Sequence, residues 1–69
     1  MTKLIETLIA NYNAKHVVEN VVRFTIGDDD YVYFGDTSTL YGEVDGELLP
    51  GASTVKTVKS LEKFIALRA

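Results

Sequence analysis

The stretch that decides the fold is VVENVVRFTIGDDDYVYFGDTSTLYGEVDGELL, residues 17–49. Its β-branched and aromatic residues alternate with polar ones and are interrupted by short clusters of turn-forming residues, a pattern typical of consecutive antiparallel strands. We expect strands at 17–26, 31–34 and 39–44, joined by turns at 27–30 and 35–38. Asp45-Gly46 is a preferred pair for a two-residue type I′ turn, which would lead into a short fourth strand at 47–49.

Outside this stretch, both ends of the chain show helical spacing of apolar residues. Residues 3–14 predict a helix, with Thr2 as its N-cap and an apolar face that comprises Leu4, Ile5, Leu8, Ile9 and Tyr12. Pro50 and Gly51 are expected to end the sheet. A second helix is expected at about 54–67, capped by Ser53 or Thr54, with a stripe that comprises Val55, Val58, Leu61, Phe64 and Ile65.

The order of these elements predicts an α+β fold. We expect one small domain over residues 1–69, α-β-β-β(-β)-α, with an antiparallel meander sheet and both helices packed on one face. A domain of this size is marginally stable on its core alone, and the chain has no cysteine with which to staple it.

Alternation along the strands predicts which side chains face the helices. The core face is expected to hold Val18, Val22, Phe24, Ile26, Val32, Phe34, Leu40 and Val44. The opposite face would hold Arg23, Thr25, Tyr31, Tyr33, Tyr41 and Glu43. Three tyrosines on an open face either stabilise the sheet through cross-strand pairs or form a contact surface for a partner. A stacking platform for nucleic-acid bases is a third option, for which Arg23 is the one nearby cation.

Carboxylates gather toward one end of the predicted sheet. The turns at 27–30 and 45–46 lie at the same end of a meander, which places there Asp28, Asp29, Asp30, Asp45 and Glu47. Three consecutive aspartates splay apart and lack the spacing of a calcium loop, so we expect no metal site and no other cofactor. The remaining interpretations are a solvated turn and an acidic surface that docks on a basic partner.

Charge is distributed unevenly along a chain whose formal net charge is −3. Nine of the ten acidic residues precede residue 53, whereas four of the seven basic residues follow it. The acidic balance argues against sequence-independent nucleic-acid binding. The alternative is that Lys56, Lys59 and Lys63 on one helical face, with Arg23, contact phosphates.

The predicted order of elements resembles that of the double-stranded-RNA-binding domain, and GASTVKTVKSLEKFIALRA (51–69) is similar to that family's last motif. The resemblance implies that Ser53, Lys56 and Lys59 face phosphates. The lysines here are spaced rather than adjacent. The first hairpin loop is Gly-Asp-Asp-Asp, where the family has a Gly-Pro-x-His pattern.

In size, acidity and lack of catalytic residues, the chain also resembles the small inhibitor proteins that phages encode against host machinery. We therefore expect a non-enzymatic, cytoplasmic protein-binding module without a membrane segment. Its partner would present a basic surface and itself handle nucleic acid. Self-association into a homodimer through an open sheet edge or the tyrosine face is a further alternative.

Overall fold

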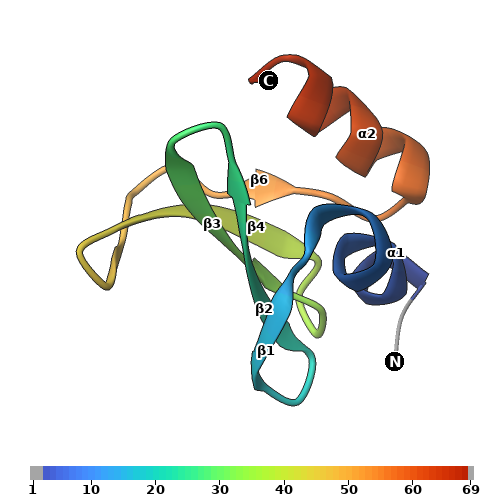
Figure 1. Cartoon of the computed structure of the whole chain (residues 1–69), viewed down its shortest axis with the longest axis horizontal. Helices are drawn as coiled ribbons and strands as arrows, with labels where there is room; N and C mark the ends of the chain where they lie inside the picture. Colours follow the sequence, from blue (N-terminus) through green and yellow to red (C-terminus); the bar gives the residue numbers. More distant parts are fainter. Residues whose placement is uncertain (1–2, 69) are drawn as a thin grey trace.

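The computed structural model describes residues 3–68. The elements in chain order are α1 (Lys3–Tyr12), β1 (Lys15–Val18), β2 (Val21–Ile26), β3 (Asp29–Phe34), β4 (Thr39–Val44), β5 (Glu47–Leu48), β6 (Ser53–Thr54) and α2 (Val58–Ala66), as Figure 1 shows. The predicted N-cap of the first helix, Thr2, lies outside the described residues.

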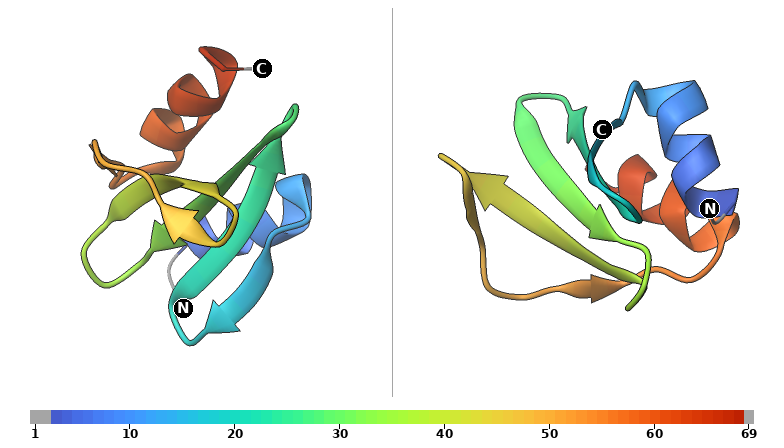
Figure 2. Two further views of the ribbon diagram at one scale, coloured as in Figure 1. Left: turned by 90° about the vertical axis from the view of Figure 1, so that its left-hand side faces the viewer. Right: turned by 90° about the horizontal axis from the view of Figure 1, so that it is seen from below.

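The six strands form one antiparallel sheet. Strands β1 to β5 are neighbours in sequence order, and β6 returns to pair with β4 beside β5. Both helices lie on the same side of this sheet, as the two views of Figure 2 show. The predicted α+β class and meander are confirmed.

The prediction of a single strand at 17–26 is wrong, because the chain turns in the middle of this segment. β1 and β2 form a hairpin whose turn contains Asn20 with a φ of 63°, a left-handed conformation that asparagine tolerates better than most residues. The register shifts between His16 and Val18, which marks a bulge in β1. Val18 is therefore exposed on an edge strand rather than buried in the core.

The hairpin between β2 and β3 is tighter than predicted. Ile26 pairs with Asp29, so the turn contains only Gly27 and Asp28, and Gly27 has a φ of 62°. Asp29 and Asp30 are consequently strand residues. The next predicted turn pair, Asp45-Gly46, has φ values of 53° and 82°, as a type I′ turn requires.

The second helix begins later than predicted. Ser53 and Thr54 pair with Leu40 and Thr39, so the segment after Pro50 rejoins the sheet instead of leaving it. The N-cap is Thr57, whose Oγ1 accepts a 3.1 Å hydrogen bond from the backbone N–H of Ser60. Neither Ser53 nor Thr54 is the cap.

The core lies between the sheet and the two helices. Its buried members are Leu4, Ile5, Leu8, Ala14, Val22, Phe24, Ile26, Tyr33, Leu40, Val55, Leu61 and Ile65. Tyr31 extends this core, because its ring stacks on Phe24 with centroids 5.8 Å apart and meets Phe64 edge-on at 5.5 Å. An apolar contact between β2, β3 and α2 thus fixes the second helix on the sheet.

Candidate functional site

The face of the sheet turned away from the helices is the first candidate surface, and we call it the outer face. Strand register assigns its residues, since directly paired residues project to the same side. Its central row is Arg23, Val32 and Tyr41, and its next row toward the turn is Thr25, Asp30 and Glu43. Tyr41 is therefore the one predicted tyrosine of the three that occupies this face.

Tyr31 and Tyr33 were predicted on the outer face, and both lie on the core face instead. Tyr33 pairs with Val22 and Leu40, is 1% exposed, and donates a 2.8 Å hydrogen bond to the carbonyl oxygen of Val55. Tyr31 pairs with Phe24 and is half-buried in the aromatic contact with α2. These positions leave neither tyrosine ring on the outer face.

Phe34, predicted in the core, takes the place of those tyrosines on the outer face. Its ring meets that of Tyr41 edge-on, with centroids 5.4 Å apart, and both residues are half-buried. Val32, also predicted in the core, pairs directly with Tyr41, lies two residues before Phe34 on β3, and is 4% exposed. The outer face thus carries an aromatic pair over a buried valine, and neither helix covers it (Figure 2).

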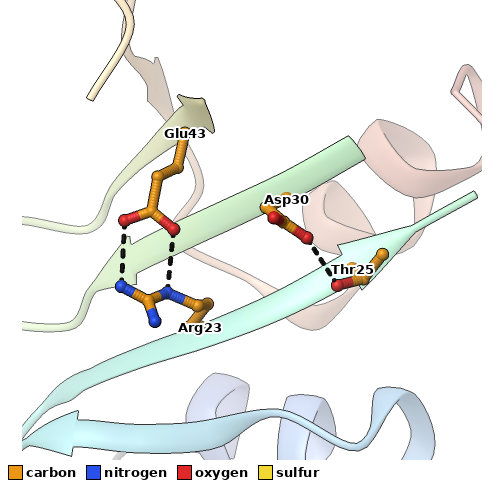
Figure 3. A network of polar contacts seen from close by, with 4 residues as sticks. All are labelled: Arg23, Thr25, Asp30 and Glu43. Carbon is orange, nitrogen blue, oxygen red and sulfur yellow. Dashed lines mark hydrogen bonds and ion pairs between the residues drawn. The ribbon is translucent and has the colours of Figure 1, made fainter. Parts of the chain in front are cut away.

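An ion pair crosses the outer face from β2 to β4. Arg23 binds Glu43 with both ends of its guanidinium, Nε to Oε1 at 2.8 Å and Nη2 to Oε2 at 3.0 Å (Figure 3). The Glu43 side chain is 8% exposed, and the Arg23 side chain is 51% exposed. Because this carboxylate holds the guanidinium, Arg23 is a poor phosphate contact in the nucleic-acid alternative.

The predicted acidic residues are all exposed. Asp28 lies in the β2–β3 turn, and Asp29 and Asp30 begin β3, where Asp30 Oδ1 accepts a 2.8 Å hydrogen bond from Thr25 Oγ1 (Figure 3). Asp45 and Glu47 belong to the β4–β5 hairpin. We call Asp28, Asp29, Asp30, Asp45 and Glu47 the acidic end.

The register between β3 and β4 places both hairpin turns of the acidic end at the same end of the sheet. Asp30 pairs with Glu43, so the β2–β3 turn and the β4–β5 turn lie beyond the same ends of β3 and β4. Sheet twist spreads their tips, with the first turn at the top and the second at the left in Figure 1. The carboxylates are therefore distributed over one end of the sheet rather than focused on one point.

Apolar side chains are exposed next to these carboxylates, which the sequence did not reveal. Val44 is 53% exposed although it was predicted in the core, and Leu48 and Leu49 are 45% and 44% exposed. Leu49 N–H donates to the carbonyl of Gly42 at 2.8 Å, and its side chain lies over that glycine, 3.2 Å from where a Cβ would stand. The β4–β5 hairpin thus presents apolar surface beside Asp45 and Glu47.

The lysines of the nucleic-acid alternative do not share one helical face. Lys59 and Lys63 lie in α2, whereas Lys56 precedes the N-cap. All three are exposed. Ser53 belongs to β6, so it does not open the last helix as the double-stranded-RNA-binding resemblance requires.

Metal sites and membrane-spanning helices are two further possibilities for residues 3–68. In that range, no three His, Asp or Glu side chains gather closely enough to hold a metal ion, and no helix is long and apolar enough to cross a membrane. Comparison with protein-family models, curated proteins and solved structures found no match to this chain.

Proposed function

We propose that this chain is a non-enzymatic, cytoplasmic protein-binding module that docks its outer face and acidic end on a basic partner. The observation that carries the proposal is the arrangement of the uncovered face. The outer face carries the aromatic pair Phe34–Tyr41, and exposed apolar residues of the β4–β5 hairpin lie beside Asp45 and Glu47. Asp28, Asp29 and Asp30 lie at the same end of the sheet as that hairpin.

This composition is that of a protein interface. Stable interfaces combine an apolar, often aromatic centre with a polar rim, and the centre is poor in free charges. Here Arg23 and Glu43 neutralise each other beside Val32, so the centre of the outer face carries no net charge. The free carboxylates lie at its edge, where they would steer association and select the partner.

The charge at the edge specifies the chemistry of the partner. Asp28, Asp29, Asp30, Asp45 and Glu47 would attract lysine- and arginine-rich surfaces, which proteins most often use to hold nucleic-acid phosphates. A bound module of this kind would cover such a surface and compete with the nucleic acid. We therefore propose inhibition of a nucleic-acid-handling protein as the biological outcome.

The experiment compares partner capture from source-cell lysate by three forms of the chain. They are the wild type, the variant Asp28→Asn/Asp29→Asn/Asp30→Asn, and a matched control. The control Glu6→Gln/Glu19→Gln/Glu62→Gln makes the same change in net charge at exposed positions outside the acidic end. The captured partner is then purified and its affinity measured between about 50 mM and about 200 mM salt.

We expect the aspartate variant to bind the partner more weakly and with a flatter salt dependence, while the control binds as the wild type does. The melting temperature should change little, because the three aspartates are exposed. Equal binding by the aspartate variant and the wild type would refute the proposal. Loss of all capture after nuclease treatment would support nucleic-acid binding by Lys56, Lys59 and Lys63 instead.

A further inference from the structure

A cavity lies on the helix side of the sheet, whereas the proposed interface uses the outer face. It lies between the start of α1, the β3–β4 turn and the segment that leads into α2, and its volume is about 290 Å³. Lys3, Ser38 and Lys56 are among the residues that line it. An inference about what this cavity binds does not depend on the proposed function.

Among residues 3–68, two cations and no carboxylate line this cavity. Lys3 comes from α1 and Lys56 from the segment before α2, so the fold brings them to one place from opposite ends of the chain. Neither lysine belongs to the ion pair found among residues 3–68, which joins Arg23 and Glu43. Both lysines are exposed, and a cavity lined by two cations attracts an anion.

The other polar groups of the cavity add no negative charge. The Tyr33 hydroxyl donates to the Val55 carbonyl, and burial raises the pKa of Tyr33 above its ordinary value, with a hydrogen bond from Ser38 acting in the opposite direction. The tyrosine therefore stays neutral at physiological pH. The Thr57 hydroxyl donates to Ser60 Oγ at 3.0 Å, which leaves the two lysines as the groups that would hold a ligand.

From this geometry we infer that the Lys3–Lys56 cavity binds the phosphate group of a small phosphorylated molecule. The ammonium groups supply six N–H donors, and a phosphate dianion balances both charges with acceptor oxygens. The cavity is larger than a phosphate group alone requires, so a phosphomonoester with a compact organic part is favoured over free phosphate. Hydration of an open cavity predicts weak, millimolar binding rather than tight binding.

The test is a titration of the ¹⁵N-labelled chain with inorganic phosphate and, separately, with phenyl phosphate at low ionic strength. Backbone amide signals of Ser38, Lys56 and Thr57 should shift and saturate in the millimolar range, with phenyl phosphate binding more tightly. Lys3→Gln and Lys56→Gln should each weaken binding about tenfold. The control Lys59→Gln removes a lysine that is also exposed but does not line the cavity, and it should leave binding unchanged.

Three outcomes would overturn the inference. Shifts that rise linearly without saturation would show only nonspecific attraction, and an equal loss in Lys59→Gln would show that net charge alone matters. Saturation at the same concentration in Lys56→Gln as in the wild type would place the ligand elsewhere. Because none of these variants touches the acidic end, the result is independent of the partner-capture experiment.

Discussion

The hydroxyl of Tyr33 donates a 2.8 Å hydrogen bond to the backbone carbonyl of Val55, two residues ahead of the N-cap of α2. Both residues are buried, at 1% and 2% exposure. This bond ties the centre of the sheet to the segment between β6 and the second helix. It also explains why a tyrosine occupies a core position, since a buried hydroxyl needs a partner.

Tyr33→Phe should destabilise the fold without changing its shape. The substitution keeps the ring but leaves the buried Val55 carbonyl without this donor, which costs about 1–3 kcal/mol. Urea unfolding would measure the loss in unfolding free energy. Tyr41→Phe is the matched control, because Tyr41 is half-buried on the outer face, where water can reach the site. Equal losses in both variants would contradict the role given to the Tyr33–Val55 bond.

The same tyrosine should make stability depend on alkaline pH. Burial raises the folded-state pKa of Tyr33 above 10.0. The contribution of Tyr33 to the unfolding free energy is therefore complete below about pH 10 and falls as pH rises through the folded pKa. The unfolding free energy of the wild type should therefore decline above about pH 10 more steeply than that of Tyr33→Phe. Parallel curves from about pH 8 to about pH 11 would show that Tyr33 does not titrate differently in the two states.

Turn chemistry that is local to a dipeptide could be predicted from the sequence, whereas a turn without such chemistry could not. Asp45-Gly46 formed the expected turn because both residues accept positive φ. Asn20 also adopts positive φ, but it lies inside Val-Val-Glu-Asn-Val-Val, where apolar residues flank it on both sides and favour a single strand. Thr57 was missed as the N-cap because Ser53 and Thr54 offered equivalent side chains earlier in the chain.

The wrong face prediction for Tyr31 and Tyr33 has a different cause. A turn of either two or four residues after Ile26 keeps Tyr31 and Tyr33 on the face of Ile26, so pairing alone places them in the core. The prediction applied alternation within each strand but not the pairing across the turn, and it gave the core to Val32 and Phe34. The burial of Glu43 under Arg23, by contrast, depends on the register between three strands, which no local pattern reports.

Gly35 should not tolerate a side chain. A Cβ at this position would stand 2.8 Å from Ile5 Cδ1 and 3.1 Å from the carbonyl oxygen of Asn20. Since Ile5 is fully buried, Gly35→Ala should cost about 1–3 kcal/mol of unfolding free energy. Ile5→Val removes the clashing methyl group, so thermal unfolding of the double variant should show less destabilisation than the two single losses predict. Simple additivity would argue against this steric cause.

The ion pair between Arg23 and Glu43 should contribute more than an ordinary surface pair. Arg23→Met leaves a carboxylate that is 8% exposed without its bidentate partner. We expect a loss of about 1–2 kcal/mol, between the values for exposed and fully buried pairs. Adding Glu43→Gln should restore part of this loss, because the unpaired charge is removed. Urea unfolding of Arg23→Met, Glu43→Gln and the double variant gives the coupling energy between the two side chains. A coupling energy of zero would contradict the prediction.

Tyr41 should be an energetic centre of the proposed interface. Its ring stands edge-on to Phe34 on the uncovered face, so Tyr41→Ala should weaken partner binding about tenfold or more, while it costs the fold about 0.5–1.5 kcal/mol through the lost aromatic pair. Tyr12→Ala is the control, because Tyr12 packs against the core from α1 and should affect stability but not binding. Calorimetric titration of the purified partner with both variants separates the two effects. If Tyr41→Ala bound as tightly as the wild type, the outer face would be excluded as the contact surface, and a partner, if one binds, would contact the acidic end alone.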